Sequence, residues 1–206
     1  MESRICLIRH GITEGNVRRL YYGQTDVPLA QKGVDELKRL AGEGLYPDSE
    51  AARFFTTGLA RTTQTRELIY GDRPQEVIED LQEINFGEFE MKTYEQLLDN
   101  PDYRDWITAE DLDKIPPGGE SIRQFNRRII RGFEELRRRH SLRFLQFRHH
   151  SEDALSVVIC HGGTISAIMA HLWPEEHDNM YGWIPDSGHG YVLRLVDDQV
   201  VGYNAF

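Results

Sequence analysis

The sequence predicts an α/β domain with a mostly parallel central sheet and helices on both faces. One observation is that short apolar runs alternate with segments whose apolar residues recur at helical spacing. A second is that two apolar runs, residues 5–8 and 157–160, lead into His10-Gly11 and His161-Gly162. Open α/β sheets place their chemistry at the carboxyl ends of strands. We therefore expect both histidines to share one pocket.

In the first half of the chain, strand and helix patterns follow one another. Residues 5–8 and 53–57 predict buried strands. Between them, residues 31–41 predict a helix with apolar residues on one face, namely Val34, Leu37, Leu40 and Ala41. A second helix follows Leu59 among threonines that can cap it. Arg61 lies in its first turn, where it can meet an anion at the helix N-terminus.

In the second half, residues 121–140 predict a long helix. Its apolar stripe is typical of a core-facing helix and consists of Ile122, Phe125, Ile129, Phe133 and Leu136. Residues 155–160 predict a strand and residues 163–173 a helix. Residues 191–196 and 200–203, joined through two aspartates, predict a hairpin on the sheet.

The segment 91–117 interrupts this alternation. It holds Tyr94, Tyr103, Trp106 and Ile107 among many acidic residues. One interpretation is a small helical lid insertion over the pocket. The other is a packed helical excursion whose aromatic side chains face the core.

Composition favours one compact domain over residues 1–206. The chain has 39% hydrophobic residues and no long proline, glycine or serine run. Its formal net charge of -10 argues against a nucleic-acid partner. Arginines 137–139 stand beside two glutamates at the predicted end of the long helix, so we interpret them as a solvated helix end.

The first residues lead at once into a predicted strand, with neither a secretory signal nor a membrane span. We therefore expect a cytoplasmic protein without a membrane partner. Cys6 and Cys160 each fall in a predicted central strand, so we expect small buried side chains and not a disulfide.

Arginine and amide side chains accompany the two histidines. Arg9 precedes His10, Asn16 follows it, and Arg61 opens a helix. A guanidinium matches phosphate oxygens, whereas arginines and histidines without a thiolate cluster make a poor transition-metal site. We expect a phosphate group as the guest, with no metal and no cofactor.

Residues 9–16, Arg-His-Gly-Ile-Thr-Glu-Gly-Asn, resemble the signature of the histidine phosphatase superfamily, the phosphoglycerate mutase-like fold. Five further blocks resemble the family in the same order, at residues 20–33, 59–65, 81–90, 117–121 and 160–163. Three positions depart from the usual pattern: Ile12 replaces an acid or amide, Phe89 a tryptophan and Met91 a glycine. The departures bear on substrate preference.

The resemblance implies that His10 attacks phosphorus and forms a phosphohistidine, with its other ring nitrogen held by the backbone. Arg9, Asn16, Arg61, His161 and Gly162 are expected to surround the phosphoryl oxygens.

The resemblance also implies that Glu83 acts as general acid and then as base. Spacing alone does not choose Glu83 over its acidic neighbours, which are Glu79, Asp80, Glu88 and Glu90.

Three functions stay open at this point. A phosphatase acting on a small phosphorylated metabolite is favoured, because Ile84 follows Glu83 where mutases of the superfamily typically carry arginine, and because the insertion is short and acidic. The alternatives are a phosphoglycerate mutase and a non-catalytic phosphate-binding module. Sugar phosphates, phosphoglycerates and α-ribazole phosphate are all candidate substrates. The sequence assigns neither an oligomeric state nor a role for His189.

Overall fold

A computed structural model describes residues 2–48, 50–146 and 154–206 of the chain. Its sheet has six strands in the order β3-β2-β4-β1-β5-β6. The strands are β1 (Glu2–Arg9), β2 (Arg53–Thr56), β3 (Gln75–Val77), β4 (Ala154–Cys160), β5 (Gly190–Val196) and β6 (Gln199–Ala205). β1 to β4 run parallel and β5 pairs antiparallel with both neighbours. The predicted fold class and the C-terminal hairpin are confirmed.

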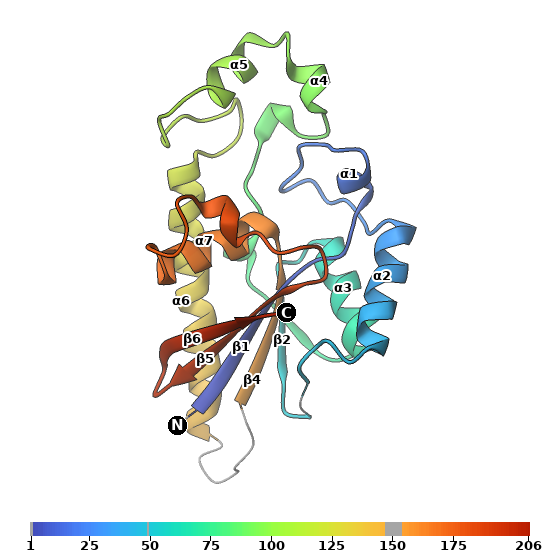
Figure 1. Cartoon of the computed structure of the whole chain (residues 1–206), viewed down its shortest axis with the longest axis vertical. Coiled ribbons are helices and arrows are strands. Elements are labelled where there is room, and N and C mark those ends of the chain that lie inside the picture. Colours follow the sequence, from blue (N-terminus) through green and yellow to red (C-terminus); the bar gives the residue numbers. More distant parts are fainter. Residues whose placement is uncertain (1, 49, 147–153) are drawn as a thin grey trace.

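Helices cover both faces of this sheet, as Figure 1 shows. The α-helices are α1 (Glu14–Val17), α2 (Gln31–Gly42), α3 (Ala60–Tyr70), α4 (Tyr94–Leu97), α5 (Pro101–Ile107), α6 (Ile122–Gln146) and α7 (Gly162–Leu172). Short 3-10 turns are η1 (Glu79–Leu81), η2 (Gly87–Phe89) and η3 (Met180–Trp183). α2 and α3 lie on one face, and α6 and α7 lie on the other. In the described part of the chain, no helix is both long and apolar enough to cross a membrane.

Successive side chains of β1 point to opposite faces of the sheet, and each set belongs to a separate hydrophobic cluster. Ile5 and Leu7 belong to the large cluster that includes the apolar stripe of α6, whereas Cys6 and Ile8 belong to the cluster with Phe54 on the opposite face. Both cysteines are free and buried, as the sequence predicts, and burial raises the pKa of each thiol. The side chains of β1 therefore pack on both sides, which fixes the strand in the centre of the sheet.

The register of β1 and β4 brings the two histidines together. The strands are parallel, with Arg9 opposite Cys160. Since His10 and His161 are the next residues, they leave the same edge of the sheet side by side. The ring centroids lie 5.3 Å apart.

The long helix differs from its prediction. α6 continues to Gln146 instead of ending at residue 140. Arg137, Arg138 and Arg139 therefore lie more than one turn before its end, where the helix dipole no longer explains them. They form ion pairs within the helix and with neighbouring segments, to Glu134, Glu135, Glu76 and Asp198. β3 was also not predicted, because its Gln-Glu-Val sequence is too short and polar to stand out.

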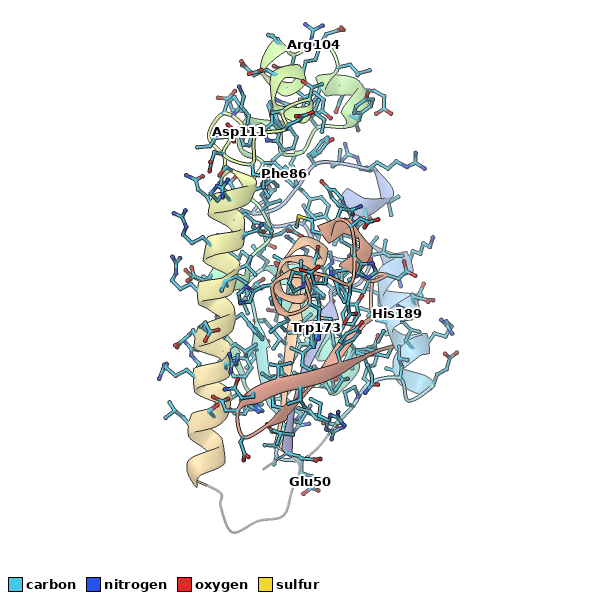
Figure 2. The ribbon with its side chains drawn as sticks, turned by 60° about the vertical axis from the view of Figure 1, so that its left-hand side comes forward. Glu50, Phe86, Arg104, Asp111, Trp173 and His189 are labelled. Atoms are coloured by element: carbon cyan, nitrogen blue, oxygen red, sulfur yellow. The ribbon has the colours of Figure 1, made fainter. Side chains whose placement is uncertain are left out.

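The segment 91–117 forms a helical excursion beyond the carboxyl edge of the sheet, with α4 and α5 at its end. Figure 2 shows Phe86 at the base of this excursion and Arg104 at its far end. Tyr103 is completely buried in a small separate cluster with Phe89 and Leu97. Residues of the excursion thus pack together with Phe89, Phe86 and Tyr21 from outside it, whereas Tyr94 and Ile107 are exposed. Its action as a lid stays a prediction.

Candidate active site

His10 stands at the carboxyl end of β1 and is nearly fully buried. Its Nδ1 lies 2.7 Å from the carbonyl oxygen of Gly11. Because a carbonyl oxygen can only accept, Nδ1 carries the proton and Nε2 keeps the lone pair. Burial, together with the charges of Arg61 and Arg9, lowers the pKa of His10 to about 3. The imidazole is therefore neutral at physiological pH and has a free ring nitrogen for attack.

Arg61 lies in the first turn of α3 and is completely buried. Its guanidinium donates to the carbonyls of Thr25, at 3.0 Å, and Gly23. Its Nε lies 3.3 Å from Nδ1 of His161, and the group stacks over the ring of Tyr22 at 5.1 Å. These three hydrogen bonds use three of the five N–H donors of a guanidinium. The remaining donors can bind an anion.

Glu90 holds the loop that orients Arg61. Its carboxylate accepts from the backbone N–H groups of Gly23, Gln24 and Thr25, at 3.1, 3.0 and 2.7 Å. A side chain at Gly23 would clash, since a Cβ there would lie 1.5 Å from the carbonyl oxygen of Ile84. The carboxylate of Glu90 is thus engaged with backbone donors and does not line the pocket.

Glu83 is the acidic residue of the 79–90 segment that lines the pocket. Its Oε2 accepts from the backbone N–H of Gly163, in the first turn of α7, at 2.8 Å, and its Oε1 accepts from Ile84 N–H at 2.9 Å. A Cβ at Gly163 would lie 2.4 Å from Oε1 of Glu83, so the second glycine after His161 makes room for the carboxylate.

The other acids of this segment lie elsewhere. Glu79 and Glu88 are exposed. Asp80 forms a bidentate pair with Arg131. Packing therefore separates carboxylates that their spacing in the sequence leaves equivalent.

Arg9, Asn16 and Gly162 also line the pocket. Arg9 donates from Nη1 to the carbonyl of Pro185 at 2.7 Å, while its buried Nε has no hydrogen-bond partner among the described residues. A buried donor of this kind indicates a ligand. Asn16 closes the capping box of α1 with Thr13. Gly162 begins α7, where backbone N–H groups favour an anion.

His161 lies beside His10 but does not line the pocket. It is completely buried, with Nε2 2.9 Å from Oγ1 of Thr57. Because arginine can only donate, Nδ1 of His161 accepts from Arg61 and Nε2 carries the proton. Burial lowers the pKa of His161 well below its ordinary value, and Arg61 and His10 add to this effect. Both ring nitrogens of His161 thus contact Thr57 and Arg61, and its expected contact with phosphoryl oxygens stays a prediction.

The pocket has a volume of about 450 Å³ and two kinds of lining. Its polar side chains are those of Arg9, His10, Asn16, Arg61 and Glu83. The remaining wall is largely apolar and aromatic, with Phe86 from the acid segment, Trp106 and Ile107 from α5, and Tyr181 and Ile184 at η3 and its end.

The lid interpretation places Trp106 and Ile107 over the pocket, but no sequence pattern assigns Phe86, Tyr181 or Ile184 to the site. The aromatic residues of segment 91–117 are the sequence signal that points to α5. No sequence pattern points to η3 as part of the pocket. His189 lies beside α2, away from Phe86, with its Nδ1 3.3 Å from the carbonyl oxygen of Ser187 (Figure 2). Within the described ranges, no group of three or more His, Cys, Asp or Glu side chains is arranged to hold a metal ion.

Comparisons with known proteins find relatives among phosphatases and phosphoglycerate mutases. Residues 5–202 match the model of the histidine phosphatase superfamily (branch 1). The adenosylcobalamin/α-ribazole phosphatase of Salmonella typhimurium is 30% identical over 178 residues, covering 82% of this chain and 79% of the relative. The 2,3-bisphosphoglycerate-dependent phosphoglycerate mutase 2 of Gloeobacter violaceus is 33% identical over 189 residues, covering 84% and 78%. A putative α-ribazole-5'-P phosphatase from Escherichia coli superposes with a TM-score of 0.78 at 25% identity, covering 99% and 94%.

Proposed function

The chain belongs to branch 1 of the histidine phosphatase superfamily, and we propose that this phosphomonoester hydrolase acts on monophosphates whose alcohol half is uncharged and largely apolar. The composition of the pocket lining carries this proposal. Arg9 and Arg61 are the only arginine or lysine side chains among the described lining residues, and both stand beside His10. A substrate with one phosphate satisfies them. An additional anionic group would meet an apolar wall and lose its hydration without a partner.

The proposed reaction has two displacements. Nε2 of His10 attacks phosphorus, the bond from phosphorus to the alcohol oxygen breaks, and Glu83 gives its proton to the leaving alkoxide. A water molecule then attacks the phosphohistidine while Glu83 accepts its proton, which releases inorganic phosphate and restores His10. The hydrogen bond from Nδ1 to Gly11 supports this role, because it directs the lone pair to Nε2.

Arg9, Arg61, Asn16 and the backbone at Gly162 are proposed to bind the phosphoryl oxygens. Charge-assisted hydrogen bonds are strongest in a buried site and stabilise charge in the transition state. The contact between His161 and Nε of Arg61 supports a role for His161 in orienting this arginine.

α-Ribazole phosphate fits the proposed class, since it carries one phosphate on a nucleoside with an aromatic base. The names of the phosphatase relatives point to the same compound. The mutase alternative has a relative too. Phosphoglycerates, however, add a carboxylate for which the apolar wall offers no cation.

The setting of the reaction is also a proposal. The net charge of -10 supports a small phosphorylated metabolite, and not a nucleic acid, as the partner. Free buried cysteines support a cytoplasmic location, where thiols stay reduced.

Phosphate release by the purified protein tests the substrate class. In the presence of EDTA, we expect hydrolysis of α-ribazole phosphate with a higher kcat/KM than for sugar phosphates or 3-phosphoglycerate. With 3-phosphoglycerate and a catalytic amount of 2,3-bisphosphoglycerate, free phosphate should form faster than 2-phosphoglycerate. Efficient isomerisation with little phosphate release would establish the mutase instead. Strict dependence on an added divalent metal would contradict the mechanism.

Rapid quenching during turnover tests the intermediate. An acid-labile, base-stable phosphoryl group should be trapped on His10, because its imidazole presents the free nitrogen in the pocket. His10→Ala should abolish both the trapped species and turnover. A phosphoryl group on serine, aspartate or cysteine would refute the scheme.

A further inference from the structure

Arg128 of α6 binds the backbone of the segment that carries Glu83. Its Nη1 donates to the carbonyls of Asp80 and Gln82, at 3.0 and 2.8 Å, and its Nη2 donates to the carbonyl of Glu83 itself at 3.2 Å. Three carbonyls in four residues thus converge on one guanidinium. This arrangement fixes where the backbone of Glu83 lies relative to α6.

Glu120 completes the arrangement on the other side of Glu83. Its carboxylate accepts from Nε of Arg128, at 3.2 Å, and from Nη2. Its Oε1 also accepts from the backbone N–H of Asn85 at 2.9 Å. Both charged side chains are only 15% exposed, so water competes weakly for these bonds.

We propose that the Arg128–Glu120 pair is a positioning device for the acid, an inference that rests on the proposed role of Glu83. The pair holds the backbone on both sides of Glu83, and Gly163 N–H holds the carboxylate itself. General acid catalysis needs the carboxyl within hydrogen-bond reach of the leaving oxygen, and a small displacement removes most of its benefit. Neither Arg128 nor Glu120 lines the pocket, and both bind the backbone of the segment that carries Glu83.

A merely structural role and a positioning role predict different kinetics. A general acid matters for an alkoxide, which is a poor leaving group, and hardly for an activated aryl oxide. Loosening the acid should therefore slow alkyl phosphates selectively. General damage to the pocket would slow both kinds of substrate equally.

The variants for this test are Arg128→Lys and Glu120→Gln. Lysine keeps the charge but cannot reproduce the fork, and glutamine keeps an acceptor for Asn85 N–H while removing the charge. Arg131→Lys is the matched control, since Arg131 lies on the same helix and binds the same segment through the side chain of Asp80, at 2.6 and 2.9 Å. Thermal unfolding of every variant identifies those that fold. If Arg128→Lys does not fold, Glu120→Gln carries the test.

Single-turnover formation of phosphohistidine is measured with an alkyl phosphate and with 2,4-dinitrophenyl phosphate. We expect Arg128→Lys and Glu120→Gln to slow the alkyl substrate at least tenfold and the aryl substrate less than threefold, as orders of magnitude for a partial loss of acid catalysis. Arg131→Lys should change neither rate. In the Glu83→Gln background, Arg128→Lys should cause no further loss, because residues acting through one group are not additive.

Equal losses for both substrates, or a full additional loss in the Glu83→Gln background, would overturn the positioning role while leaving the proposed function in place. If Glu83→Gln itself slows alkyl and aryl substrates equally, Glu83 is not the acid. That result would overturn the proposed acid and this inference together.

Discussion

A buried histidine is a good nucleophile when it stays neutral and directs its lone pair to the substrate. At His10, the carbonyl of Gly11 fixes the tautomer and burial beside Arg61 and Arg9 disfavours the imidazolium. The same arginines that are proposed to bind the phosphate group therefore keep the proposed nucleophile unprotonated. This residue-scale arrangement needs no separate base to activate His10.

The state of His10 can be measured directly. In the phosphate-free protein, the ¹⁵N resonances of His10 should show a protonated Nδ1 and an unprotonated Nε2 that do not change between pH 5 and pH 8, because its pKa is lowered to about 3. His10→Asn assigns the signals by their loss. A titration with a midpoint near pH 6.5 would contradict the burial argument.

Two short elements, α5 and η3, contribute apolar and aromatic side chains to the pocket lining. α5 contributes Trp106 and Ile107, and η3 contributes Tyr181. The aromatic cluster around Tyr103 anchors α5, and the hydroxyl groups of Tyr103 and Tyr21 lie 2.6 Å apart. A rigid element can thus present exposed apolar side chains to a substrate, which favours an aromatic alcohol half over a polar one.

Ile107→Ser tests this element. Ile107 is 46% exposed, so the fold should tolerate the change, while the KM for α-ribazole phosphate should rise by roughly fivefold or more through lost apolar contact. Inhibition by inorganic phosphate, which does not reach α5, should stay unchanged. Leu112→Ser is the control, because Leu112 is 51% exposed and does not line the pocket. An unchanged KM in Ile107→Ser would exclude this wall from substrate binding.

At the scale of the whole molecule, several histidines are buried in the neutral state. Besides the pair in the site, His140 of α6 is nearly fully buried, with Nδ1 2.8 Å from Oγ of Ser156 in β4. Its Nε2 has no hydrogen-bond partner in the parts of the chain that the structure describes. Burial lowers the pKa of His140 to about 4, with Asp198 opposing and Arg53 reinforcing the shift. Folding is therefore linked to pH far from the site.

The sign of this linkage follows from the lowered pKa. The unfolded chain binds a proton at His140 below about pH 6.5, whereas the folded chain binds it only near pH 4, so the contribution is full above pH 6.5 and is lost as the pH falls toward 4. The loss is on the order of 3 kcal/mol in the free energy of unfolding.

Urea unfolding of the wild type and of His140→Gln between about pH 6.5 and pH 4 isolates the contribution of His140 to the free energy of unfolding. Glutamine can bind Ser156 but does not titrate, so the pH dependence should be shallower in the variant. Parallel curves for the two proteins would show that His140 does not cause the acid instability.

The local pattern of apolar residues predicts most of the helices and strands of the fold. The continuous apolar runs at residues 5–8 and 155–160, and the stripe on residues 122–136, are found in β1, β4 and α6 because burial imposes its period directly on the sequence. β3 was missed, since a short polar edge strand carries no such period. The predicted helix also stopped at residue 140, whereas α6 continues to Gln146.

The sequence by itself determined the strand ends that present His10 and His161, the two pocket arginines and the family resemblance, because these depend on local order and residue type. Tertiary structure decided the rest. It placed Glu83 at α7 and Glu90 on the Arg61 loop, although their spacing leaves them equivalent. It set His161 behind Arg61, and it brought α5 and η3 to one pocket. These outcomes depend on contacts between distant segments, which close packing selects and no local pattern records.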